Sequence, residues 1–263
     1  MEKQSPLETL FSLRGHVGLV TGASVGLGVE CAHALALAGA DVALVARREQ
    51  LLQGLASELR KSYGVKILPI AADITVEADL DRVISRTVAE LGEIDILVNN
   101  AGIAPGGRAE KYSRAAWDAA FAVNVTAPMV LSQKFARRLI ERKKPGRIIN
   151  VTSLAGYLGS AVFRYVGYAA SKAALANLTR QLAIEWADHG ILVNAVAPGL
   201  IPTDMNVDSL TKPGIREQNE ALTPLKRLGR PEEIRGAVIL LASGASSYMT
   251  GTAISIDGGR QAW

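Results

Sequence analysis

The sequence contains very few residues that could form disulfides or bind metals. Only one cysteine and three histidines occur among its 263 residues. Cys31 has no second cysteine to pair with, so an internal disulfide is excluded and no oxidising compartment is required. The histidines, His16, His33 and His189, are scattered along the chain. We therefore expect no metal centre.

The chain also lacks long apolar runs and a marked excess of either charge. Its most apolar region, 31–46, is interrupted by Gly39 and Asp41, and residues 1–13 do not resemble a secretory signal. The 29 Lys and Arg residues exceed the 25 Asp and Glu residues by only four, for a formal net charge of +4. We therefore expect a cytoplasmic protein with no membrane or nucleic-acid partner.

Strand and helix patterns alternate along most of the sequence. Short apolar runs rich in β-branched residues are typical of strands buried on both faces, and the longer stretches between them favour helices. The predicted strands are 17–21, 42–46, 66–71, 94–99, 146–151, 191–197 and 253–257, and the predicted helices are 29–37, 48–62, 77–91, 115–143, 168–188 and 231–242. This alternation predicts one α/β domain over residues 1–263, a doubly wound parallel sheet of the Rossmann type with helices on both faces.

Residues 201–230 are the longest stretch without clear periodicity, and they include Pro202, Pro213 and Pro224. A loop of this length in a compact domain is often functional. This one follows a strand end, where α/β proteins form their sites. We therefore expect a substrate lid at 201–230, with a surface excursion of no function as the alternative.

A glycine-rich turn, 21–28 (TGASVGLG), lies between the first predicted strand and the first predicted helix. Its glycines would let the backbone turn tightly and approach a pyrophosphate, whose charge is favoured by the helix N-terminus. Three glycines alone are a weak signal, and a purely structural turn is the alternative. The position between strand and helix favours a dinucleotide site. A phosphate-binding loop is excluded because no Gly-Lys-Ser/Thr follows.

Tyr168 and Lys172 stand four residues apart in a predicted helix, so both side chains share one face, about 5–6 Å apart. A tyrosine with the ordinary pKa of about 10 exchanges protons poorly at neutral pH. Since an adjacent ammonium stabilises the phenolate, we expect Lys172 to lower the pKa of Tyr168. This spacing also occurs by chance in exposed helix pairs. Ser153, just after a predicted strand, favours the catalytic interpretation.

These motifs resemble those of the short-chain dehydrogenase/reductase family, in the same order and over nearly the whole chain. The matching segments are the Thr21-Gly22 start of the glycine turn, 99–102 (NNAG) after the fourth strand, and 257–259 (DGG) near the end. The resemblance implies an NAD(P)-dependent oxidoreductase acting on CH–OH groups. Its catalytic residues would be Asn124, Ser153, Tyr168 and Lys172.

The same resemblance implies individual roles. Tyr168 would donate a proton to a carbonyl oxygen as hydride arrives from the nicotinamide, and Ser153 would hydrogen-bond that oxygen. Lys172 would hold the nicotinamide ribose, and Asn124 would position a water linking Lys172 to solvent. The cofactor-binding residues implied are Gly22, Ser24, Val25, Gly26, Leu27, Gly28, Arg47, Arg48, Asp73, Ile74, Asn100, Ala101, Gly102, Tyr168, Lys172, Pro198, Gly199, Ile201 and Thr203.

The interval between Ser153 and Tyr168 is two residues longer than the commonest family spacing. Residues 154–167 are therefore expected to form a longer lip on the substrate pocket. Tyr165 is not expected to be the catalytic acid, because Ala169 rather than a lysine follows it four residues later.

The end of the second predicted strand bears on the choice of cofactor. NAD-binding relatives usually place an acid there for the adenosine ribose, whereas this chain has Ala46, followed by Arg47 and Arg48. A guanidinium can bind a 2′-phosphate through paired, charge-assisted bonds. We therefore expect NADP(H) to be favoured over NAD(H); two solvated arginines at a helix start are the alternative. Val25 departs from the basic residue that many NADP-using relatives carry before the second glycine.

The substrate is left open between several classes. The leading expectation is a small ketone or secondary alcohol, such as a sugar acid or polyol, and residues 10–13 faintly resemble gluconate 5-dehydrogenase-like members. A 3-oxoacyl-(acyl-carrier-protein) reductase fits the core motifs equally well. A non-catalytic NADP(H) sensor is disfavoured by the complete catalytic set. The basic run 141–147 fits a solvated helix end, with a docking site for an acidic carrier protein as the alternative. The resemblance implies a homotetramer.

Overall fold

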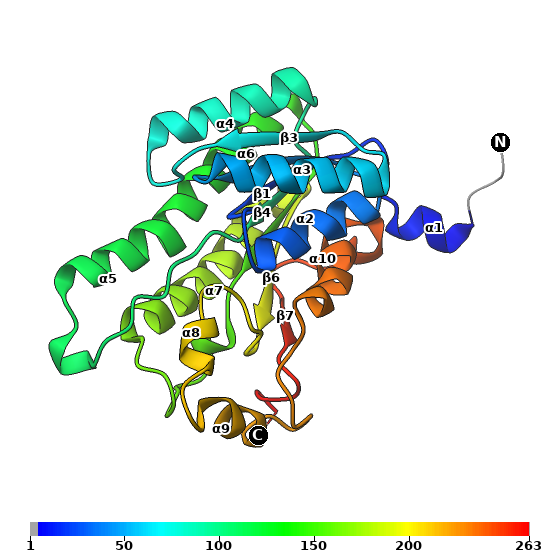
Figure 1. Cartoon of the computed structure of the whole chain (residues 1–263). Helices are drawn as coiled ribbons and strands as arrows, with labels where there is room; N and C mark the ends of the chain where they lie inside the picture. The colour runs from blue at the N-terminus through cyan, green and yellow to red at the C-terminus, as the bar shows by residue number, and fades with distance from the viewer. Residues whose placement is uncertain (1–4, 263) are drawn as a thin grey trace.

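The strands of the computed structural model, which describes residues 5–262, form one parallel sheet of seven (Figure 1). The strand order is β3-β2-β1-β4-β5-β6-β7. Strands β1 to β3 are therefore added toward one edge of the sheet and β4 to β7 toward the other, and the order changes direction between β1 and β4. Their bounds are β1 Val17–Thr21, β2 Asp41–Ala46, β3 Ile67–Ala71, β4 Ile96–Asn99, β5 Gly146–Val151, β6 Ile191–Pro198 and β7 Ala253–Ile256. This topology confirms the predicted Rossmann-type α/β fold.

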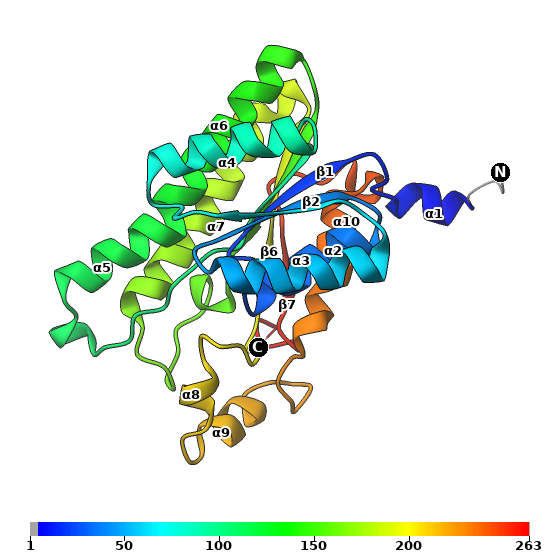
Figure 2. The same ribbon diagram turned by 45° about the horizontal axis from the view of Figure 1, so that its top comes forward.

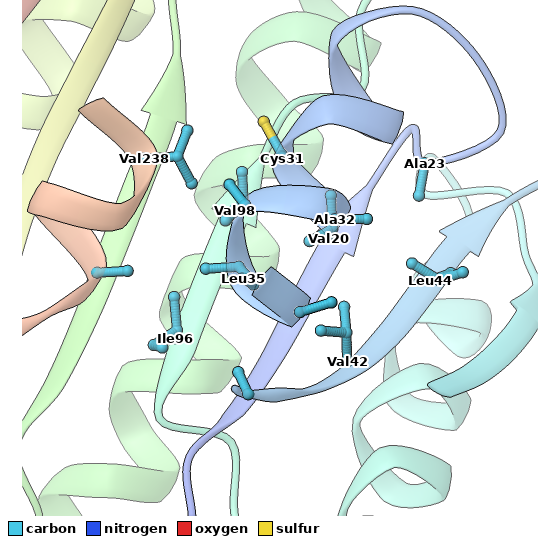
Figure 3. Close-up of a cluster of buried hydrophobic side chains, with 14 of the residues drawn as sticks. Val20, Ala23, Cys31, Ala32, Leu35, Val42, Leu44, Ile96, Val98 and Val238 are labelled. Carbon is cyan, nitrogen blue, oxygen red and sulfur yellow. The ribbon is translucent and has the colours of Figure 1, made fainter. Parts of the chain in front are cut away.

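Helices cover both faces of the sheet, as Figures 1 and 2 show. The helices α2 Leu27–Leu37, α3 Glu49–Tyr63 and α10 Arg235–Ala242 pack on one face, and α4 Glu77–Glu90, α6 Ala127–Arg142 and α7 Val166–Trp186 pack on the other. Successive strand residues point to opposite faces, so Leu19 of β1 joins one core and Val20 the other. Figure 3 shows Cys31 and Leu35 of α2 packed between β1 and Val238 of α10.

The predicted helix 115–143 is not continuous. It consists of α5 Arg114–Phe121, a π-helical turn Ala122–Thr126, and α6. Pro128 has no N–H to donate to the carbonyl of Asn124, four residues earlier, so the regular helical ladder cannot continue there. Such wide turns often mark functional positions, and this one contains a predicted catalytic residue.

The segment 201–230 contains more regular structure than its sequence indicates. It forms α8 Val207–Leu210 and α9 Ile215–Ala221, which lie below the carboxyl ends of the strands in Figure 1. Both helices are too short to show a clear helical spacing of apolar residues, so the sequence did not predict them. The same holds for α1 Pro6–Phe11. The predicted helix 231–242 begins with a 3₁₀ turn, Pro231–Ile234, before α10. Within residues 5–262, every helix is too short or too polar to traverse a bilayer.

Candidate active site

A cleft of about 830 Å³ opens at the carboxyl ends of the strands, beside β1 and β4, between which the strand order changes direction. Ligand sites of doubly wound folds form at this position. The cleft brings together most of the residues selected from sequence: Gly22, Ser24, Val25, Gly26, Leu27, Arg47, Arg48, Asp73, Ile74, Asn100, Ala101, Gly102, Ser153, Tyr168, Lys172, Pro198, Gly199, Ile201 and Thr203.

The turn after β1 is shaped by contacts with the residues that follow β4. The hydroxyl of Thr21 accepts hydrogen bonds from the backbone N–H groups of Asn100 and Ala101, at 3.1 and 3.2 Å. The side chain of Asn100 donates to the carbonyl of Thr21 at 3.0 Å. Gly22 has φ of +66°, and a Cβ there would lie 2.7 Å from Cα of Ala101. Glycine is therefore required at this position by both conformation and space.

Gly28 does not line the cleft, but it allows the turn to close. A Cβ on Gly28 would overlap the carbonyl oxygen of Gly22 and lie 2.5 Å from Nδ2 of Asn100. Gly26, with φ of +59°, precedes α2, and no side chain caps that helix. Backbone N–H groups at the start of α2 are thus left for an anion in the cleft. This arrangement fits the pyrophosphate of a dinucleotide.

Two arginines and one aspartate lie at the other end of the cleft, after β2 and β3. Nη2 of the exposed Arg48 donates to the hydroxyl of Ser24 at 3.0 Å, which joins the end of β2 to the glycine turn. Hydrogen bonds from the side chain and backbone of Thr75 lower the pKa of Asp73, and the charge of Arg47 lowers it further. Asp73 is therefore an anion at neutral pH, close to a cation that the 2′-phosphate of NADP could use.

The predicted catalytic group lies at the opposite end, around the start of α7. Tyr168 and Lys172 are one helical turn apart, and Nζ of Lys172 lies 5.7 Å from the centre of the Tyr168 ring. That nitrogen donates to the carbonyl oxygen of Val151, at the end of β5, at 2.7 Å. Ser153, two residues beyond Val151, is hydrogen-bonded to the Tyr168 phenol. A hydroxyl, a phenol and an ammonium thus meet at one point of the cleft.

The expectation that Lys172 lowers the pKa of Tyr168 is wrong for this structure. Burial raises the pKa of Tyr168 to about 12, and the hydrogen bond with Ser153 opposes that rise only in part. Burial also lowers the pKa of Lys172 to about 8. The low-dielectric site penalises both charged forms, and this penalty outweighs the mutual stabilisation that the four-residue spacing suggested.

Asn124 lies behind the cleft and is fully buried. Its side chain accepts from the N–H of Ile103 at 2.9 Å and donates to the carbonyl of Ile103 and the hydroxyl of Ser171, each at 2.9 Å. These bonds tie the segment after β4 to α7, directly beside Lys172. Through these bonds Asn124 fixes the position of both segments at the site. Its role in positioning a water stays a prediction.

Residues 154–167, expected to form a lip on the substrate pocket, are not among the residues that line this cleft. They do pack beside it: the Tyr165 ring lies edge-on to the Tyr168 ring at 5.5 Å, and Phe163 stacks on Tyr165 at 5.6 Å. Several lining residues were not predicted and carry no motif, among them Ala46, Ala72, Thr75, Ile103, Ala119, Ala122, Val123, Val151, Thr152, Asp204, Met205 and Asn206. Over residues 5–262, the structure has no group of three or more His, Cys, Asp or Glu residues placed to hold a metal ion.

Comparison with known proteins decides the family. Residues 22–261 match the model of a family described as enoyl-(acyl carrier protein) reductase. The chain belongs to the short-chain dehydrogenase/reductase family. It is therefore an oxidoreductase that acts on CH–OH groups with a nicotinamide cofactor.

Similar members differ in their named substrates. Galactitol 2-dehydrogenase (L-tagatose-forming) of Cereibacter sphaeroides is 37% identical, covering 97% of this chain and 98% of the relative. A 3-oxoacyl-(acyl-carrier-protein) reductase of Aquifex aeolicus is 35% identical, covering 94% and 98%. The solved structure of a gluconate 5-dehydrogenase from Burkholderia cenocepacia, in complex with NADP and tartrate, is 33% identical with a TM-score of 0.92, covering 98% and 99%.

Proposed function

We propose that this short-chain dehydrogenase/reductase uses NADP(H) to interconvert a secondary alcohol and a ketone on a polyol or sugar acid. The observation that carries the proposal is the cleft itself. Ser153, Tyr168 and Lys172 converge at one of its ends, and Arg47 and Arg48 lie at the other. The fit to a dinucleotide rests on the uncapped start of α2 and on the crowding that glycine relieves at residues 22 and 28.

The residues around Tyr168 supply acid–base chemistry. A bound nicotinamide provides or accepts the hydride. In reduction, the phenol of Tyr168 donates its proton to the substrate's carbonyl oxygen, and the hydroxyl of Ser153 donates a hydrogen bond to the same oxygen. The ammonium of Lys172 stabilises the phenolate that is left behind. In oxidation, the same phenolate receives the proton of the alcohol.

The preference for NADP(H) rests on the residues at the end of β2. Ala46 offers no carboxylate to the adenosine ribose, whereas Arg47 and Arg48 provide two guanidinium groups at the edge of the cleft. NADP is present in the solved gluconate 5-dehydrogenase of similar fold. A charge-assisted contact to the 2′-phosphate is worth about 1.5–3 kcal/mol.

The substrate class is inferred from the relatives and from charge at the surface. Named relatives act on galactitol and on gluconate, and a 3-oxoacyl-(acyl-carrier-protein) reductase is the rival. An acidic carrier protein needs free positive charge for docking. In the basic run 141–147, Arg142 already pairs with Glu93 at 2.9 Å, which favours the small-molecule alternative. We also expect a single domain with a lid at 201–230, a homotetramer and a cytoplasmic location.

A substrate panel tests the proposal. Purified enzyme would be assayed in both directions with NADP(H) and NAD(H) against alditols, aldonates, their keto forms and an acyl-carrier thioester. We expect the highest kcat/KM for a polyol or sugar acid with NADP(H). A higher kcat/KM for the thioester would favour the carrier-protein reductase, and binding of NADP(H) without any turnover would favour the sensor.

A further inference from the structure

Residues 103–112, between β4 and α5, are joined to the start of α7 just before the catalytic tyrosine. The backbone N–H of Gly107 donates to the carbonyl oxygen of Arg164 at 2.8 Å, and Gly107 forms an isolated parallel bridge with Tyr165. The helix α5, which follows this segment, lies beside α7 in Figures 1 and 2. Among residues 5–262, no side chain caps the start of α7. The position of its first turn therefore depends on the neighbouring segment.

The side chain of Tyr112 packs directly on the backbone of Gly167, the residue before Tyr168. A Cβ on Gly167 would lie 2.8 Å from the phenolic oxygen of Tyr112 and 2.9 Å from Cε1 of its ring. Gly167 is buried, and any larger side chain at this position would have to displace Tyr112 or the helix. Tyr112 thus limits movement of the α7 backbone at the residue that precedes the catalytic phenol.

Tyr112 is itself held by the segment after β4. Its hydroxyl donates to the carbonyl oxygen of Pro105 at 3.0 Å. Its ring lies against Gly107, where a Cβ would be 3.1 Å from Cδ2. Two residues before Pro105, Ile103 lines the cleft and makes two backbone hydrogen bonds with the buried side chain of Asn124. The phenol of Tyr112 therefore connects a segment that is fixed at the cleft to the first turn of α7.

We propose that Tyr112 is a positioning residue, which holds the first turn of α7 so that the phenol of Tyr168 stays within reach of the substrate oxygen. The inference rests on the proposed function for the acid–base role of Tyr168, and it does not depend on the substrate class. Tyr112 does not line the cleft, so it acts through Gly167 and not on the substrate. A misplacement of about 1 Å at a reacting group can lower the rate about 10²-fold.

Two variants of Tyr112 separate positioning from general packing. For Y112A, which removes the ring, we expect kcat with the best substrate of the panel to fall at least about tenfold, while the dissociation constant of NADPH changes by less than about twofold. Y112F keeps the ring and loses only the bond to Pro105, so it should retain most of kcat. Y248A is the control and should match wild type, because the side chain of Tyr248 is fully exposed. A smaller loss of kcat in Y112A, or an equal loss of NADPH affinity, would overturn the proposal.

A substitution on the other side of the contact tests the contact itself. In G167A the added Cβ would collide with the phenol of Tyr112, so kcat should fall here too, again with little change in NADPH affinity. In Y112A/G167A the methyl group enters space that the ring has left, and alanine favours a helix more than glycine does. The losses of the two single variants should therefore not multiply. Losses that multiply would show that the two residues act independently, against the proposal.

Hydrogen exchange separates this inference from the proposed function, because it needs no turnover. The backbone N–H of Ala169 donates to the carbonyl oxygen of Tyr165 at 3.0 Å, within the first turn of α7. In the NADPH complex this amide should exchange faster in Y112A than in wild type or Y248A, with the same far-ultraviolet circular dichroism in all three. Equal exchange in wild type and Y112A would overturn the inference. If wild type turns over no polyol or sugar acid, the proposed function fails, and exchange at Ala169 still decides whether Tyr112 holds α7.

Discussion

Nζ of Lys172 lies 5.7 Å from the centre of the Tyr168 ring and is anchored 2.7 Å from the carbonyl oxygen of Val151. The lysine is thus held at the end of β5 and not merely beside the tyrosine on α7. Burial moves the two pKa values apart, down to about 8 for the lysine and up to about 12 for the tyrosine, because it penalises the charged form of each group. An anionic oxygen developing at Tyr168 would therefore be stabilised by an ammonium that has few competing partners.

Replacing Tyr168 with Phe should remove the acid and leave the ring. We expect kcat to fall by about 10²–10⁴-fold, because a positioned general acid contributes that much. The dissociation constant of NADPH, measured by fluorescence titration, should change little. Tyr165→Phe is the matched control, since its ring touches that of Tyr168 and it has no lysine one turn later. Retention of more than about a tenth of wild-type kcat in Y168F would refute the assignment.

The lowered pKa of Lys172 should appear as a pH-dependent stability. The ordinary value is 10.5 and the buried value is about 8, so between these pH values the unfolded chain binds a proton that the folded chain lacks. The contribution of Lys172 to the free energy of unfolding therefore increases as pH rises from 8 to 10.5. Urea unfolding of wild type and K172M at several pH values gives this contribution as their difference. A difference that stays flat or decreases would contradict a lowered pKa.

The sequence was sufficient to predict the sheet because the strands are buried on both faces. All five residues of β1 are buried, and such an uninterrupted apolar run has no other stable place in a small α/β protein. The glycine turn was predictable for a related reason, since the positive φ of Gly22 restricts the residue that can stand there. Both features depend only on neighbouring residues, so the residue pattern indicates them directly.

Features that depend on contacts between distant segments were not predictable. The spacing of Tyr168 and Lys172 identified the pair but gave no measure of burial, so the direction of the tyrosine pKa was predicted wrongly. The anchor of Lys172 is a backbone carbonyl, which no side-chain motif records. Predicting the break between α5 and α6 would have required giving the missing N–H of Pro128 more weight than the strong helical pattern around it.

Glycine at position 22 should be needed for stability as well as for cofactor binding. An alanine there would have φ of +66° and a Cβ 2.7 Å from Cα of Ala101. We expect G22A to lower the free energy of unfolding by about 1–3 kcal/mol and to weaken NADPH binding. Gly54→Ala is the control, because it lies within α3 with no atom within 4 Å of the added Cβ. That variant should be neutral or more stable by up to about 1 kcal/mol in urea unfolding.

Cofactor choice should follow the residues at the end of β2. Arg47 and Arg48 are exposed at the edge of the cleft, and Arg48 is held by Ser24 at 3.0 Å. We expect kcat/KM to be at least about tenfold higher with NADPH than with NADH, mostly through KM, because the phosphate lies far from the reacting carbon. High salt should reduce this ratio, since exposed charges are screened. The double variant A46D/R47Q should reverse the preference, because the new carboxylate repels the phosphate and accepts from the ribose. Equal or better use of NADH by wild type would show that these arginines do not select the cofactor.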